Sequence, residues 1–329
     1  MKFVIYGVGA IGGVLAAKLA LSGAEVVGIA RGPQLDAIRK RGLLLRTPDG
    51  EETVRFGAAG DPDEIKFDAD DVIILAMKTQ DTPVALQRLR AAGIVEQPII
   101  CAQNGVTNER FALRRFPNVY AMTVILPSTF VHAGEVTAFG APHAGILDLG
   151  RYPYGADDTA EMIAAALRKA GFASEVDAEI MASKYGKLMQ NLANIIEAAL
   201  IPGDHATIIK AARDEAEAVY KVAGITWRDV GESDPRRQEL LQSKPVPGAE
   251  RVGSSTAQSL VRHTGSIETD YLNGEIVLLG RLNDIPTPVN VYFSALAQRM
   301  IGEKLKPRSI SPAEVEREIA IAALAQAQA

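Results

Sequence analysis

A glycine-rich turn close to the N-terminus constrains the fold more than any other feature of this chain. The apolar, β-branched run KFVIYGV leads into this turn, and the alanines and leucines between Ile11 and Leu21 favour a helix directly after it. In a strand–turn–helix unit, the first glycine permits the tight turn, the second admits a pyrophosphate to the backbone, and the third lets helix and strand pack closely. The spacing Gly-x-Gly-x-x-Gly therefore predicts a dinucleotide-binding turn that comprises Gly7, Val8, Gly9, Ala10, Ile11 and Gly12.

A secretory leader is the alternative interpretation of this stretch, since Lys2 precedes apolar residues. Five glycines between Gly7 and Gly23 would interrupt the apolar segment of a leader, and the strand-like run EVVGIAR follows at once, so the strand–turn–helix interpretation is preferred. The single cysteine, Cys101, fits a reducing compartment, which favours a cytoplasmic protein. A net charge of −5 gives no electrostatic reason to expect nucleic acid or anionic membranes as partners.

The rest of the chain divides into two parts with different sequence patterns. Residues 1–177 alternate between helical stretches and strand-like runs such as DVIILAM and QPIICAQ, whose continuous apolar character is typical of strands covered on both faces. This alternation predicts an α/β, Rossmann-type domain with a parallel sheet. Residues 178–329 carry long helical patterns, including MASKYGKLMQNLANIIEAAL, and predict an all-helical domain.

The residue at the end of the second strand indicates which dinucleotide binds. An acid about 20 residues after the glycine turn would bind the ribose 2′-hydroxyl of NAD, whereas an arginine suits a 2′-phosphate. Arg31 occupies this position, in GIARG, and no acid stands at that strand end. The sequence therefore favours NADP(H), with an ordinary solvated arginine as the alternative.

Five stretches together resemble the ketopantoate reductase (2-dehydropantoate 2-reductase) family. They are GVGAIGG, AMKTQD with Lys78, QNG with Asn104, KLMQNLAN with Lys187 and Asn191, and SSTAQSLVRHTGSIETDYLNG with Ser255 and Glu268. The resemblance implies reduction of a 2-keto acid to a 2-hydroxy acid with NADPH, ketopantoate to pantoate in pantothenate and coenzyme A biosynthesis being the type reaction. It also implies that the helical domain of residues 178–329 serves substrate binding and catalysis. In the family this domain closes over the NADPH-binding Rossmann domain, here residues 1–177, with a small keto acid as partner.

Lys187 is the residue that we expect to carry the chemistry. At about 100° per residue, Lys187, Asn191 and Asn194 share one helix face, although a solvated face is the alternative. Hydride delivery to a keto carbon develops alkoxide charge, which a cation able to donate a proton would stabilise. Because an unperturbed lysine is a poor acid at neutral pH, we expect partial burial to lower its pKa.

The resemblance assigns roles to six further residues. It implies that Lys78 lies near the cofactor, that Asn104 contacts cofactor and substrate, and that Asn191, Asn194 and Ser255 bind substrate. Glu268 would meet both the cofactor and the substrate hydroxyl, with Asp270 as the competing acid. From spacing alone, Lys78 could be an exposed lysine, Asn104 part of an Asn-Gly turn, and Ser255 a helix N-cap.

Several positions depart from the family pattern near the expected substrate site. Ile195 stands eight residues after Lys187, where the family carries a second asparagine, and PGDHA, with His205, replaces another asparagine-glycine pair. The stretch from Ser255 to Glu268 also looks one residue longer. These departures leave open a same-fold reductase for a different keto acid, or a non-catalytic NADP-binding sensor. No metal site is expected from the four scattered histidines, and a homodimer is one option for assembly.

Overall fold

The computed structural model describes residues 1–231, 233–250, 253–261 and 266–327, and the chain forms two compact units. The sheet unit comprises Met1–Lys184 and Asp229–Arg251, and the helical unit comprises Tyr185–Arg228 and Val252–Ala329. The predicted fold class, a Rossmann-type parallel sheet followed by a helical C-terminal region, is confirmed. The functional division between residues 1–177 and 178–329 stays a prediction.

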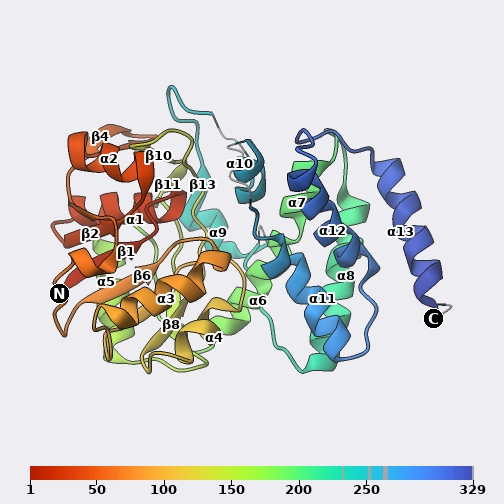
Figure 1. Ribbon diagram of the computed structural model, residues 1–329, viewed down its shortest axis with the longest axis horizontal. Coiled ribbons are helices and arrows are strands. Elements are labelled where there is room, and N and C mark those ends of the chain that lie inside the picture. The colour runs from red at the N-terminus through yellow and green to blue at the C-terminus, as the bar shows by residue number, and fades with distance from the viewer. Residues whose placement is uncertain (232, 251–252, 262–265, 328–329) are drawn as a thin grey trace. The chain divides into compact units, whose positions relative to one another are not determined.

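A seven-stranded sheet forms the framework of the sheet unit (Figure 1). All of its neighbouring strands pair in parallel except β12 (Leu149–Arg151) and β8 (Val119–Met122), an antiparallel pair at one side of the sheet. The two runs predicted as fully covered strands, DVIILAM and QPIICAQ, contain β6 and β7, and every residue of both strands is buried. The strands in spatial order are β12 (Leu149–Arg151), β8 (Val119–Met122), β7 (Ile99–Cys101), β6 (Val72–Leu75), β1 (Lys2–Tyr6), β2 (Glu25–Ile29) and β5 (Gly57–Ala59).

Helices cover both faces of this sheet, which explains the continuous apolar runs. Alternate strand residues point to opposite faces, so Phe3 and Ile5 join one core cluster and Val4 joins the other. The first cluster includes α1 (Ala10–Leu21) and α5 (Asp158–Lys169), and the second includes α3 (Thr82–Ala91) and α4 (Asn108–Leu113).

Smaller elements complete the sheet unit. A four-stranded sheet has the order β4-β3-β10-β9, and β11 pairs with β13. Their bounds are α2 (Gly32–Arg41), β3 (Leu43–Thr47), β4 (Gly50–Val54), η1 (Pro62–Glu64), η2 (Thr79–Asp81), β9 (Ser128–Thr129), β10 (Glu135–Ala138), β11 (Gly140–Pro142), α9 (Pro235–Leu240) and β13 (Leu241–Ser243).

The glycine turn joins β1 to α1 through an unusually close backbone approach. Gly7 has a φ of +102°, which side-chain-bearing residues rarely adopt. A β-carbon placed on Gly12 would lie only 2.1 Å from the carbonyl oxygen of Gly7, so only glycine lets the helix pack this close to the strand. The predicted role of the third glycine as a packing residue thus has a direct steric basis.

The helical unit consists of helices apart from its loops, as the sequence pattern predicts (Figure 1). Helix α6 begins in the sheet unit and continues into this one. No helix among the described residues is long and apolar enough to cross a membrane. The helices are α6 (Ile180–Asn191), α7 (Ala193–Ala199), α8 (Ala206–Ala223), α10 (Ser255–Val261), η3 (Thr269–Tyr271), α11 (Asn273–Leu282), α12 (Pro288–Gly302) and α13 (Pro312–Ala327).

A carboxylate from α8 satisfies the start of α12. Glu215 accepts hydrogen bonds from the backbone N–H groups of Val289 (2.7 Å) and Asn290 (3.0 Å), two of the orphan donors of that helix. The buried Asn290 side chain donates to Glu215 as well and to the carbonyl of Ala212. Burial raises the pKa of Glu215 because it disfavours the charged carboxylate, and the hydrogen bonds from Val289 and Asn290 offset part of this effect.

We expect Glu215→Ala to destabilise the helical unit by about 1–3 kcal/mol for each buried donor that loses its acceptor. Urea unfolding would measure this change, with exposed Glu217→Ala on the same helix as the control, expected to lie within about 0.5 kcal/mol of the parent. A carboxyl whose pKa is higher in the folded chain makes stability fall as pH rises above its unfolded pKa, so the alanine variant should lose part of that decline. Equal stability of the two variants would contradict the capping role.

Candidate active site

Four of the predicted cofactor contacts follow adjacent parallel strands of the sheet unit. The glycine turn follows β1, Arg31 follows β2, Lys78 follows β6 and Asn104 follows β7. These strands are neighbours in the order β7-β6-β1-β2, so their carboxyl ends lie along one edge of the sheet. Ligands of open parallel sheets bind at such edges, and we refer to this one as the nucleotide edge.

The glycine turn is tightly packed at Gly12 and has open space beside Gly9. A β-carbon at Gly12 would collide with the turn, whereas one at Gly9 would meet no heavy atom within 4 Å. Gly9 immediately precedes the first turn of α1, where backbone N–H groups and the helix dipole favour negative charge. Val8 is buried, and Ala10 and Ile11 are half-buried. The open space beside a helix N-terminus fits a pyrophosphate, so these residues suit a dinucleotide.

Arg31 stands at the start of α2 with 86% of its side chain exposed. Its guanidinium pairs with Asp81 from the loop after β6, at 3.2 Å. Exposed ion pairs of this kind contribute little to stability, so a phosphate can compete with Asp81 for the guanidinium at small cost. Sequence reasoning missed Asp81, and its only signal was its place three residues after Lys78 in AMKTQD.

Lys78 and Asn104 lie in the loops that follow β6 and β7, and both are half-buried. The carbonyl oxygen of Lys78 accepts a hydrogen bond from Asp81, and that of Asn104 accepts one from the Asn108 side chain. Cys101 ends β7, and burial raises the pKa of its thiol well above the ordinary value. Cys101 therefore stays protonated at neutral pH and is no nucleophile.

Apart from Asn104, the residues predicted to contact the substrate belong to the helical unit. Lys187 is half-buried on α6, and its ammonium donates to the Gln190 side chain at 3.3 Å. Asn191 is only 3% exposed, and its amide nitrogen finds no hydrogen-bond partner within the described part of the chain. A buried donor of this kind is costly, so an orphaned amide beside Lys187 suits a ligand oxygen.

The helix through Lys187, Asn191 and Asn194 is divided at Leu192, whose backbone stays in the right-handed helical region. Helix α6 ends at Asn191, and Asn194 belongs to α7, which begins at Ala193. The side chain of Asn273 donates to the carbonyl of Leu192 at the break, which gives this carbonyl a partner outside the helix. Asn194 is half-buried, and its own carbonyl accepts a hydrogen bond from Ser254.

The sequence left two choices open, Ser255 as a helix cap or a substrate contact, and Glu268 or Asp270 as the acid. The N-cap of α10 is Ser254, whose hydroxyl accepts from the backbone N–H of Ala257, so the alternative of Ser255 as the cap is wrong. Ser255 itself is exposed. Asp270 is exposed and accepts from Gln298, whereas Glu268 is half-buried just before η3. Residues 262–265, within the unusually long stretch between Ser255 and Glu268, lie outside the described residues.

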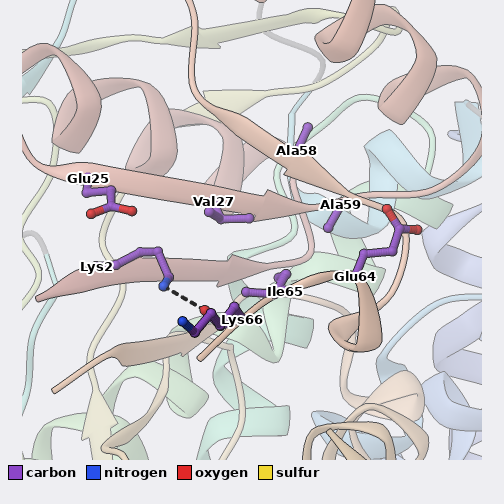
Figure 2. A pocket seen from close by; sticks show the side chains of 8 residues that line it. All are labelled: Lys2, Glu25, Val27, Ala58, Ala59, Glu64, Ile65 and Lys66. Carbon is purple, nitrogen blue, oxygen red and sulfur yellow. Dashed lines mark hydrogen bonds between the residues drawn. The ribbon is translucent and has the colours of Figure 1, made fainter. Parts of the chain in front are cut away.

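A shallow pocket lies elsewhere on the sheet unit (Figure 2). Lys2 and Glu25, which line it, begin β1 and β2, so the pocket reaches the edge opposite to the glycine turn. Figure 2 shows the Lys2 side chain directed at the carbonyl of Lys66, with a hydrogen bond of 3.0 Å. Its charges are mixed and it holds none of the predicted contacts. In the described ranges, no three His, Cys, Asp or Glu side chains gather as metal ligands would.

Several known proteins similar to this chain are named 2-dehydropantoate 2-reductase. Residues 3–153 match the family model described as ketopantoate reductase PanE/ApbA, and residues 180–300 match its C-terminal model. A 2-dehydropantoate 2-reductase from Mesorhizobium japonicum is 29% identical over 330 residues, covering 92% of this chain and 99% of that protein.

Two solved structures have the same fold. A PanE/ApbA family ketopantoate reductase from Ralstonia eutropha JMP134 is 29% identical with a TM-score of 0.75, covering 92% of this chain and 99% of that one. A D-mandelate dehydrogenase in complex with NADH and anilino(oxo)acetate gives a TM-score of 0.77 over the same shares at 22% identity, which shows the fold alone. Since both halves match the models of one family, the chain belongs to the ketopantoate reductases and is an NADP-dependent oxidoreductase.

Proposed function

We propose that this chain reduces 2-dehydropantoate to pantoate with NADPH. The observation that carries the proposal is the nucleotide edge, which gathers an open glycine turn, Arg31, Lys78 and Asn104 in a chain matched by both family models. The relatives named 2-dehydropantoate 2-reductase support the choice of substrate. The single buried thiol of Cys101 supports a reducing, cytoplasmic location.

The cofactor would be held mainly by the sheet unit. The turn from Gly7 to Gly12 would take the pyrophosphate at the start of α1, and Arg31 would bind the 2′-phosphate. Lys78 and Asn104 would contact the cofactor from the two neighbouring loops. Bound NADPH would supply the hydride for C2 of the keto acid, the one step that no side chain of the protein can provide.

Residues of the helical unit would stabilise the charge that develops on the substrate and donate a proton to it. We assign to Lys187 the stabilisation of the alkoxide that develops on the C2 oxygen, and the donation of a proton to it from Nζ. The orphaned amide of Asn191 would donate a hydrogen bond to a substrate oxygen, and Asn194 and Ser255 would add contacts. Glu268 would accept a hydrogen bond from the substrate hydroxyl and meet the cofactor.

A reductase for a different 2-keto acid is the second candidate. Ile195 holds the place of the family's second asparagine and is 1% exposed, so its side chain is part of the core and offers no polar contact. One polar contact to the substrate is therefore missing relative to the family pattern. A keto acid without the corresponding hydroxyl would lose nothing by this change.

NADPH oxidation with a panel of 2-keto acids tests the proposed function. We expect the highest kcat/KM for 2-dehydropantoate, compared with smaller pyruvate and bulkier benzoylformate. A tenfold or greater preference for another acid would establish the second candidate instead. NADPH binding without turnover of any acid would indicate a sensor.

Gly9→Ala should weaken NADPH binding without affecting the fold. The added methyl group meets no protein atom within 4 Å but enters the space proposed for the pyrophosphate. Forced contacts cost roughly 1–3 kcal/mol, so Kd should rise about tenfold or more while Tm stays unchanged. Gly12→Ala is the matched comparison and should lower Tm, because its β-carbon would collide with Gly7. Unaltered NADPH affinity in a folded Gly9→Ala protein would place the pyrophosphate elsewhere.

Arg31→Asp should reduce or reverse a preference for NADPH over NADH. A charge-assisted bond to the 2′-phosphate contributes about 1.5–3 kcal/mol, which corresponds to roughly 10- to 100-fold in Kd. Titrations of both cofactors would measure it, with exposed Arg55→Asp in the same unit as the control. Equal affinity of the parent protein for the two cofactors would refute the phosphate clamp.

Lys187→Ala should lower kcat about 10²–10⁴-fold, the range expected for a general acid, and leave the Kd of NADPH nearly unchanged. Lys221→Ala, an exposed lysine on α8, is the control. Lys184, one turn before Lys187, is unsuitable as a control because it is buried in an ion pair. Full turnover by the Lys187 variant would remove it from the chemistry.

A further inference from the structure

A buried ion pair lies directly beneath the nucleotide edge. Lys184 is 2% exposed and Glu109 is fully buried, and their side chains form an ion pair although 75 positions separate them in the sequence. The Lys184 ammonium also donates to the carbonyls of Gln103 (3.0 Å) and Cys101 (3.5 Å). These two carbonyls belong to the end of β7 and the loop that leads to Asn104.

This pair is poorly explained as a stabilising contact. Desolvating two charges costs several kcal/mol for each ion, and apolar replacements of such pairs are often as stable or more so. The second carboxylate oxygen of Glu109 is buried and has no hydrogen-bond partner among the described residues, which adds to the cost. What the pair does achieve is to hold two backbone carbonyls at a fixed place.

The Gln103 side chain links the loop after β7 to the loop after β6. Its amide nitrogen donates to the carbonyl of Met77 (3.0 Å) and to the hydroxyl of Thr82 (2.7 Å). Met77 precedes Lys78 directly, and Thr82 is the first residue of α3. The backbone of Gln103 is thus held by Lys184 while its side chain holds the loop after β6.

Asn108 closes the network from the start of α4. Its amide nitrogen donates to Thr79 (3.1 Å) and to the carbonyl of Asn104 (3.3 Å), and its amide oxygen accepts from Thr82 (2.9 Å). Asn108, Thr79 and Thr82 are all fully buried. Lys78 therefore lies between two held residues, Met77 and Thr79, and the carbonyl of Asn104 is itself held.

We propose that Lys184 and Glu109 are positioning residues for NADPH binding. They fix the conformation of the loops that carry Lys78 and Asn104. The connection runs through the hydrogen bonds of Gln103, Thr82 and Asn108. This inference rests on the proposed function, because it takes these two loops as cofactor contacts. It assigns to the buried pair a role that the reaction itself does not use. A preorganised polar network of this kind fixes side chains that would otherwise lose conformational entropy on binding.

The test separates positioning from stability by replacing the pair with apolar side chains of similar size. Lys184→Met alone should lower Tm strongly, because it leaves Glu109 buried and unpaired. The double variant Lys184→Met/Glu109→Leu should recover Tm. It should nevertheless bind NADPH roughly tenfold more weakly and show kcat/KM about 10²-fold below the parent, because the loops lose their common support.

A matched control exists at the opposite edge of the same sheet. Lys2 and Asp71 form a second buried ion pair, at 2.9 Å. Lys2 is the first residue of β1, and Asp71 directly precedes β6. Lys2→Met/Asp71→Asn should alter Tm and leave the Kd of NADPH as in the parent. Thr82→Val is the second probe should the double variant fail to fold: it removes the hydroxyl that joins Gln103 to Asn108, and it too should weaken NADPH binding.

Parental NADPH affinity in a folded Lys184→Met/Glu109→Leu or Thr82→Val protein would overturn the positioning role. Equal weakening by the Lys2/Asp71 control would overturn it too, since any loss of a buried pair would then suffice. Because the readout is a binding constant, it decides the matter even for a protein that binds NADPH but reduces no keto acid, an outcome that counts against the proposed function alone.

Discussion

The close approach of Gly12 to the carbonyl oxygen of Gly7 is the contact on which the site in the sheet unit depends. It brings α1 against β1 at a distance that no side chain would permit, and it leaves the start of α1 beside the open space at Gly9. Backbone N–H groups at a helix start attract phosphate without any charged side chain. In the proposed function, recognition of the adenosine end falls to Arg31, which reaches the same edge from β2.

The other half of the nucleotide edge is built from polar side chains instead of glycine. There the loops after β6 and β7 are joined by Gln103 and Asn108, which bond to one hydroxyl, that of Thr82. Lys184 holds the β7 side of this network from α6. The same helix continues to Lys187 in the helical unit, so the sequence KYGK places the positioning and the proposed catalytic lysine three residues apart.

Local patterns predicted the fold well because its constraints are local. Strand–glycine–helix order, continuous apolar strands and an arginine 19 residues after Gly12 all lie within short windows of sequence. The features that the sequence did not reveal depend on distant partners. The interruption at Leu192 coincides with a hydrogen bond from Asn273, 81 positions away, and the ion pair of Lys184 lies with a residue 75 positions earlier. Ser254 and Ser255 are adjacent serines, and only the geometry of the helix start separates the cap from its neighbour.

Transfer of a hydrogen label is the most direct test that this chain delivers a hydride from NADPH to C2 of 2-dehydropantoate. NADPH with both hydrogens at C4 of the nicotinamide replaced by deuterium would be incubated with the protein and the keto acid. The product would be examined by mass spectrometry and NMR. We predict pantoate with one deuterium at C2 for each NADPH consumed. Pantoate without deuterium, or consumption of NADPH without pantoate, would contradict the account.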